Sequence, residues 1–228
     1  MSEARILSVE ELLKLDLVIP SYQRPYKWTE KNIRELILDI QKGIEDANKY
    51  PNFKYRVGTV ILHANTEEEK PTYDIVDGQQ RILSFLLLKL CLNPDFTCSL
   101  LSATFSDKVT LGNLHSNSDR IREWCSSVDD GVKEAFDKAL SEVLEVVVLT
   151  VNELSEAFQL FDSQNTRGRE LYPHDLLKAY HLREIHDKYD MQRAVLKWES
   201  KDPKAIRELF DNYLFPLWNW SKIGRAHV

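Results

Sequence analysis

Two helices are predicted near the start of the chain from the spacing of its apolar residues and from a polar cap. After Thr29, apolar residues recur every three or four positions and therefore share one helix face: Ile33, Leu36, Ile37, Ile40 and Ile44. Earlier, the sequence SVEE at Ser8–Glu11 is a capping box, which predicts a short helix through Lys14. Between the two helices, Leu17–Trp28 is expected to be extended, because its prolines disfavour a helical conformation in the residues before them.

Two strands and a buried helix are predicted in the next part of the chain. Tyr55–His63 is rich in β-branched and apolar residues, and Tyr73–Gly78 resumes that pattern after a charged loop. We expect these strands to pair antiparallel across a long connection. Arg81–Leu92 is apolar on nearly every side, which is typical of a helix surrounded by other elements.

The middle of the chain carries weaker signals. Asn93–Asn117 is rich in serine and threonine, and short strands are expected around Cys98–Phe105. Helices are predicted over Ser118–Ser126 and Gly131–Leu140, and the valine-rich Glu145–Val151 predicts a further strand. The strands therefore fall mostly in the first two-thirds of the sequence.

The last third of the chain is predicted to be helical. Asn152–Asn165 has apolar residues on one side, a loop with a turn glycine follows, and Pro173 suits the first turn of a helix that runs to about Tyr189. Helix outweighs strand, so the predicted fold class is α+β. We expect a lobe containing the sheet over residues 1–150 and a helical region of the same domain over residues 151–221.

The tail of the chain is treated apart from the expected fold. Residues 222–228, with the sequence KIGRAHV, resemble the translation of a common sequencing adapter. We therefore expect this tail to be non-native and the natural protein to continue beyond Ser221.

Composition and charge narrow the class of protein. Of 228 residues, 43% are apolar, which is enough for a sizeable core. No run of about 18 apolar residues is present, so no membrane span is expected. The acid-containing N-terminus does not resemble a signal peptide, and we expect a cytoplasmic protein. A net charge of −6 argues against strong non-specific binding to nucleic acid by this chain alone, although it leaves room for a local basic patch.

Cysteine and histidine predict no metal centre. The three cysteines lack CxxC spacing, and the six histidines show no HxxxH or HExxH pairing. We therefore expect buried thiols and neither a disulfide framework nor a zinc site.

The most informative stretch is DGQQR at Asp77–Arg81, where the second predicted strand gives way to the buried helix. Gly78 permits a tight turn, and the helix begins with unpaired backbone amides that attract anions. The two glutamines add amide donors, and Arg81 adds a planar fork that fits phosphate. Asp77 has three candidate roles: metal ligand, holder of a water molecule, or helix cap. The residues leave two interpretations open, a phosphate cradle or a capped helix followed by ordinary surface polar residues.

A second polar stretch has the sequence IPSYQRPYKW. Its prolines stiffen the backbone, and the rings of Tyr22, Tyr26 and Trp28 can stack on a base. Gln23 and Arg24 supply hydrogen bonds and charge. The alternative is an aromatic segment that fills the core.

A third stretch is FDSQNTRGRELYPHDLLKAY. Asn165 and Arg167 lie beside a turn glycine between two predicted helices, and Asp175 and Lys178 are three residues apart on one helix face. The alternative is a helix cap with a surface ion pair.

The chain resembles the N-terminal domain family of GmrSD-type restriction endonucleases. Four segments carry this resemblance by their sequence and their order: IPSYQRPYKW, GTVIL, YDIVDGQQR and FDSQNTRGREL…DLLKAY. The resemblance covers roughly Ile6–Ile185. It implies a ParB/sulfiredoxin-like fold, a small mixed sheet with helices joined to a helical region. It also implies NTP-dependent defence against phage DNA with modified bases, in which this domain handles the nucleotide.

Candidate site residues follow from the resemblance and from their expected places. The residues expected to bind nucleotide are Gln23, Arg24, Gly58, Gly78, Gln79, Asn165 and Arg167. Gly58 is included because it lies in a predicted strand beside the turn, while Asn165 and Arg167 are expected to close the pocket from the helical side. The residues expected to be catalytic are Asp77, Gln80 and Arg81, with Asp77 also holding Mg²⁺ if a metal takes part.

The chain departs from the family pattern in two respects. Relatives commonly have Ser or Thr where this chain has Tyr172, a poorer helix cap. No HNH-like His–Asn–His arrangement is present, so we expect DNA cleavage by a separate HNH domain or partner subunit and contact with DNA through the full-length protein.

Three functions are compatible with these patterns. The leading interpretation is an NTP-binding and NTP-hydrolysing sensor domain without a Walker-type loop. The second is a non-enzymatic DNA-binding or assembly module whose DGQQR turn grips a DNA phosphate. The third is a nuclease, against which the lack of a dense carboxylate or histidine cluster argues.

Overall fold

The computed structural model describes residues 3–20, 23, 25–65, 70–105, 107–154 and 201–214, together with scattered positions between 156 and 197. The chain divides into two compact units, Met1–Glu153 and Leu154–Val228. Within the described part of the second unit are helix α9 (Pro203–Leu209) and a following π-helical turn, Phe210–Leu214. No helix among the described residues is long and apolar enough to cross a membrane.

The first unit is built on a mixed sheet of five strands, in the order β1-β5-β3-β4-β2 within the described residues. The strands are β1 (Glu3–Ser8), β2 (Leu17–Val18), β3 (Tyr55–Asn65), β4 (Thr72–Asp77) and β5 (Leu144–Val151). Strand β3 is central: it pairs antiparallel with β4 and parallel with β5. Strand β1 pairs antiparallel with β5, and the short β2 pairs parallel with β4.

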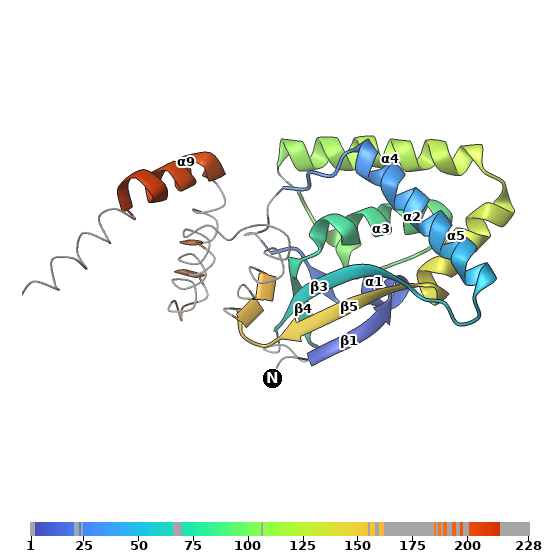
Figure 1. Ribbon diagram of the computed structural model, residues 1–228, viewed down its shortest axis with the longest axis horizontal. Coiled ribbons are helices and arrows are strands. Elements are labelled where there is room, and N and C mark those ends of the chain that lie inside the picture. Colours follow the sequence, from blue (N-terminus) through green and yellow to red (C-terminus); the bar gives the residue numbers. More distant parts are fainter. Residues whose placement is uncertain are drawn as a thin grey trace, which may run out of the picture. The chain divides into compact units, whose positions relative to one another are not determined.

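The helices of the first unit gather on one face of this sheet, as Figure 1 shows for α3, α4 and α5. They are α1 (Val9–Leu13), α2 (Glu30–Lys49), α3 (Gln79–Leu92), α4 (Lys108–Ser127) and α5 (Asp130–Glu142), with a 3-10 turn at Ser99–Ser102. Along β5, buried and half-buried residues alternate from Leu144 to Leu149, as the period of a strand with one covered face requires.

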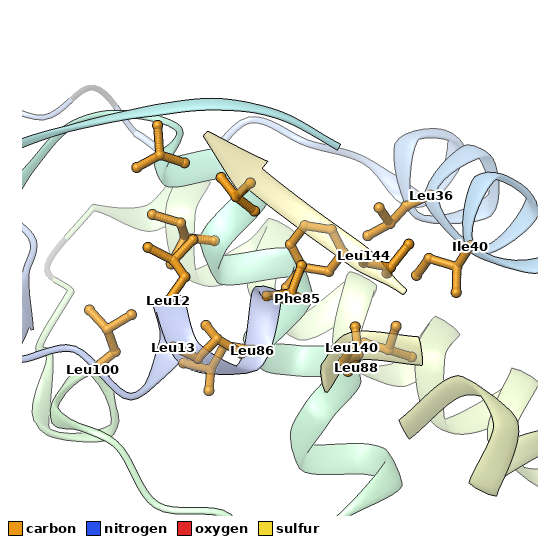
Figure 2. Packing of buried hydrophobic residues seen from close by; sticks show 14 of the residues in the cluster. Leu12, Leu13, Leu36, Ile40, Phe85, Leu86, Leu88, Leu100, Leu140 and Leu144 are labelled. Atoms are coloured by element: carbon orange, nitrogen blue, oxygen red, sulfur yellow. The ribbon is translucent and has the colours of Figure 1, made fainter. Parts of the chain in front are cut away.

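The core lies between the sheet and these helices. Figure 2 shows Leu12 of α1, Phe85 of α3 and Leu140 of α5 among its packed side chains. Each is no more than 3% exposed. The burial of α3 on most sides explains why its sequence is apolar nearly all round.

The predicted fold class, α+β, is confirmed, and so is the antiparallel pairing of the two strands around the long loop. The prediction of short strands around Cys98–Phe105 is wrong. Ser99 begins a 3-10 turn there, and its hydroxyl donates to the carbonyl oxygens of Leu15 and Leu17 at 3.3 and 3.0 Å. These side-chain bonds hold the segment against Leu15 and the first residue of β2 without a strand ladder.

The helix predicted over Ser118–Ser126 is longer than expected. It begins at Lys108, where Asp107 caps it by accepting a hydrogen bond from the Thr110 backbone amide at 2.8 Å. Strand β1 was not predicted. The helix expected from Pro173 lies largely outside the described residues.

Candidate functional site

A bulge in strand β3 opens the sheet next to the DGQQR turn. The register between β3 and β5 shifts between Arg56 and Thr59, and Gly58 has a φ of +121°. Most side chains avoid this left-handed backbone region. A Cβ atom at Gly58 would lie 2.9 Å from Nη1 of Arg81. The glycine therefore gives the chain its bulge and leaves room for the Arg81 guanidinium.

The turn from β4 into α3 depends on a second glycine. Gly78 is the N-cap residue, with a φ of +94°, and no side chain in the described part of the chain caps the helix. A Cβ atom there would lie 2.7 Å from Cγ2 of Val60. Gly78 thus occupies the cap position considered for Asp77, and the first backbone amides of α3 are left without a side-chain cap.

The positively charged guanidinium of Arg81 has only some of its N–H donors satisfied by the described residues. Its Nη1 donates to the carbonyl oxygen of Thr59 at 3.0 Å, and it forms no ion pair with a described carboxylate. Burial lowers the pKa of Arg81, and the negative charge of Asp77 partly offsets that effect. A guanidinium has five N–H donors, so one bond to a carbonyl leaves most of its capacity for a ligand.

Arg81 lines a cavity of about 280 Å³, which we name the α2–β3 cavity. Helix α2 and the chain just before it provide Trp28, Asn32, Glu35, Leu36, Asp39 and Ile40, and strand β3 provides Tyr55, Arg56 and Val57. The cavity combines apolar and aromatic side chains with four charged residues, Glu35, Asp39, Arg56 and Arg81, so its lining suits a charged ligand better than an apolar one.

Gln80 faces the protein and bonds three backbone groups. Its Oε1 accepts hydrogen bonds from the amides of Lys27 and Trp28 at 2.7 and 3.1 Å. Its Nε2 donates to the carbonyl oxygen of Pro25 at 3.2 Å. Gln80 therefore fixes the segment that brings Trp28 to the cavity, and its position indicates a role in placing Trp28.

The other two glutamines of the predicted site, Gln23 and Gln79, also point toward the protein interior. Nε2 of Gln23 donates to the carbonyl oxygens of Ile75 and Val76, at 2.6 and 2.8 Å, and so ties its segment to β4. Gln79 is 5% exposed, and its Oε1 has no hydrogen-bond partner among the described residues. Neither residue is part of the cavity lining.

Tyr26 and Trp28 of IPSYQRPYKW divide between the two interpretations given for this segment, and Tyr22 lies outside the described residues. Tyr26 is fully buried, and its hydroxyl bonds Oγ of Ser84 at 2.7 Å and accepts from Nδ2 of Asn117 at 2.9 Å. Burial raises the pKa of Tyr26. Tyr26 thus fills the core, whereas Trp28 lines the cavity.

The structure brings Gly58 and Arg81 into contact, with Asp77 close enough for its charge to act on Arg81. Three of the residues predicted to bind nucleotide, Arg24, Asn165 and Arg167, lie outside the described residues. Their expected approach to the turn stays a prediction.

Sequence reasoning missed the polar residues that α2 and β3 contribute to the cavity, among them Glu35, Asp39 and Tyr55. A signal was present. Asp39 immediately precedes Ile40, a member of the apolar stripe, so its charge borders the buried face of the helix.

A comparison with known protein families identifies the family of this chain. The sequence model of a family described as "GmrSD restriction endonuclease, N-terminal domain" matches residues 9–182. No curated protein matches the chain.

Proposed function

This chain belongs to the family of GmrSD restriction endonuclease N-terminal domains, and from that premise we propose that it binds and hydrolyses nucleoside triphosphates. Family membership makes the chain a component of a restriction system. In our proposal it is the sensor domain of a modification-dependent system in phage defence. DNA is cut by a separate HNH nuclease domain or subunit.

The contact between Arg81 and Gly58 carries the proposal. The guanidinium of Arg81 lies over Gly58, is partly desolvated and pairs with no described carboxylate. Arg81 also lines a cavity that is large enough for part of a nucleotide. Arginine binds phosphate through parallel N–H···O bonds, and such charge-assisted bonds are about twice as strong as neutral ones. The ring of Trp28, which also lines the cavity, offers a stacking surface for a base.

Hydrolysis requires that charge on the phosphoryl group be stabilised and that a water molecule be positioned. Arg81 supplies the positive charge. Asp77 is half-buried at the end of β4, near enough for its charge to act on Arg81, and is our candidate for orienting the water where a phosphate meets that guanidinium. Gln80 acts indirectly in this scheme, because its amide is bonded to the backbone that carries Trp28.

The test uses the purified chain and the four common ribonucleoside triphosphates, with and without MgCl₂ and duplex DNA. We expect at least one triphosphate to bind by calorimetry and to release phosphate. Tight binding of DNA that nucleotide does not affect, with no binding of any triphosphate, would instead favour a module that grips a DNA phosphate. The net charge of −6 makes that second result the less expected one.

A further inference from the structure

The α2–β3 cavity has charges of both signs on its walls. Glu35 and Asp39 line it from helix α2, where residues four apart share a helix face. Arg81 lines it from the β3 side, where its guanidinium lies over Gly58. Two carboxylates on a helix surface are commonplace, so their meaning depends on what else borders that space.

These charges are largely left unneutralised by the described residues. Asp39 and Arg81 form no ion pair there, and Glu35 has one loose contact, 3.8 Å to the exposed Lys31. The second arginine of the cavity, Arg56, is bound to Glu145 of β5 at 2.8 Å. The anions and the free cation thus border one cavity without binding each other.

A ligand that satisfies both walls must present negative charge to Arg81 and positive charge to the carboxylates. A phosphate-bound Mg²⁺ ion does so, because Mg²⁺ in proteins is commonly held by one or two carboxylates together with substrate phosphates and waters. No group of three or more Asp, Glu, His or Cys side chains that could hold a metal is found in the described ranges. A metal on α2 would therefore take further ligands from phosphate and water.

We propose that the α2–β3 cavity binds the magnesium-bound phosphate groups of a nucleoside triphosphate, with Glu35 and Asp39 on the metal side and Arg81 on the phosphate side. This inference rests on the proposed nucleotide binding and adds a residue assignment to it. It places the metal on α2 and not on Asp77, which does not line the cavity.

The assignment predicts a distinctive dependence on magnesium. Without the metal, the two carboxylates repel a triphosphate; with it, they hold the ion to which the triphosphate is bound. Replacing either carboxylate by its amide should therefore maintain or strengthen metal-free binding and weaken the enhancement by Mg²⁺. We expect an enhancement of about tenfold in the wild type to fall to about twofold in the double variant.

The experiment measures ATP and GTP affinity by calorimetry for the whole 228-residue chain, in MgCl₂ and in EDTA. The variants are Glu35→Gln, Asp39→Asn and their combination, with Asp77→Asn as the rival. Glu45→Gln is the matched control, since Glu45 is an exposed carboxylate on the same helix that does not line the cavity. Thermal melts should show all variants folded, because Glu35 and Asp39 are exposed side chains.

Loss of the magnesium enhancement in the α2 variants, with the control unchanged, is the expected result. Full enhancement in the double variant would overturn the assignment while leaving nucleotide binding intact, and so would its loss in Asp77→Asn alone. Absence of ATP and GTP binding to the wild type in both buffers would overturn the assignment together with the proposed nucleotide binding.

Discussion

Helix α3 carries two basic side chains in opposite surroundings, Arg81 near its start and Lys89 near its end. Lys89 is 2% exposed, and its Nζ binds Oε2 of Glu10 at 2.8 Å and Oδ1 of Asp137 at 2.6 Å. Arg81 has a backbone carbonyl as its acceptor and no carboxylate partner among the described residues. Among the described residues, one cation is therefore paired with carboxylates and the other is not.

The pKa directions express the same difference. Desolvation lowers the pKa of Lys89, but hydrogen bonds and charges from Asp137 and Glu10 outweigh it, so the pKa is raised. Desolvation also acts on Arg81, and there the charge of Asp77 does not outweigh it, so the pKa is lowered. Removing a buried cation that has carboxylate partners destabilises a fold, because the partners are left with uncompensated charge. A partly buried cation without such partners indicates a place for a ligand anion.

The largest expected effect is on stability at Lys89. Lys89→Met removes the cation, so that Asp137 loses its partner and Glu10 keeps only Lys14. This should reduce the free energy of unfolding by roughly 3 kcal/mol. Nucleotide affinity of the folded protein should not change. Urea unfolding followed by tryptophan fluorescence measures the loss.

A triple variant provides the control for Lys89. Adding Glu10→Gln and Asp137→Asn to Lys89→Met removes the uncompensated charges, and much of the lost stability should return. If Lys89→Met alone costs less than about 1 kcal/mol, the ion pairs behave like exposed ones and the contrast with Arg81 disappears.

The second prediction is that Arg81, unlike Lys89, affects ligand binding and not stability. Arg81→Ala should weaken triphosphate binding by about tenfold to a hundredfold, because a charge-assisted bond is worth roughly 1.5–3 kcal/mol. Its melting temperature should stay near that of the wild type. Arg81→Lys should restore only part of the affinity, since an ammonium lacks the two-pronged geometry.

Calorimetry and a thermal melt on each Arg81 variant test this prediction. Unchanged affinity with a lower melting temperature would mean that Arg81 serves only the carbonyl of Thr59. Arg81 would then be a structural residue like Lys89.

The third prediction concerns the glycine beneath the guanidinium. Gly58→Ala must hold a side chain at a φ of +121° and a Cβ atom 2.9 Å from Nη1 of Arg81. We expect a loss of roughly 1–2 kcal/mol in stability and weaker triphosphate binding as Arg81 is displaced. Melts and calorimetry report the two effects separately.

Gly112→Ala is the matched control for Gly58. A Cβ atom at Gly112, in helix α4, would meet no atom within 4 Å. This change should leave affinity unaltered and raise stability by up to about 1 kcal/mol. Equal behaviour of the two alanine variants would show that the space above Gly58 has no importance for Arg81.

The sequence predicted the elements with strong local patterns. The stripe of α2, the β3–β4 pair and the buried α3 follow from spacing and composition. Strand β1 escaped prediction because its partner, β5, lies more than a hundred residues away, as in the pairing of Arg5 with Val148. Local pattern does not reveal such a pairing. The prediction for the serine-rich segment around Ser99 was wrong for a similar reason. The hydroxyl of Ser99 donates hydrogen bonds to the carbonyl oxygens of Leu15 and Leu17, which are distant in sequence.

The candidate site was predictable in its location and only in part in its residues. DGQQR reads the same whether a glutamine amide faces a ligand or the backbone, and only the fold shows that Gln80 bonds Pro25, Lys27 and Trp28. The contact between Gly58 and the Arg81 guanidinium depends on the bulge in β3, and no short sequence motif predicts that bulge. The carboxylates of α2 belong to the cavity because of the packing of α2 on β3, a tertiary property.

The smallest expected effect concerns the pH dependence of the Lys89 cluster. Hydrogen bonds from Lys14 and from Lys89 lower the pKa of Glu10 below its ordinary value of 4.5. Its contribution to stability is therefore fully present above about pH 4.5 and is lost as pH falls through the lower, folded-state pKa. Lys89, with a raised pKa, loses its contribution only as pH rises beyond 10.5, outside this window. Glu10→Gln should thus be less stable than the wild type by about 1 kcal/mol near neutral pH, because Lys89 keeps Asp137 and Glu10 still reaches solvent.

Urea unfolding of both proteins between pH 7 and roughly pH 3 should show this gap closing as the wild-type carboxylate takes up its proton. Glu45→Gln, on the exposed face of α2, should show no such convergence. A gap that stays constant down to the lowest pH would mean that the Glu10 contacts contribute through packing and not through charge. The two basic residues of α3 would then differ in partners without differing in electrostatic role.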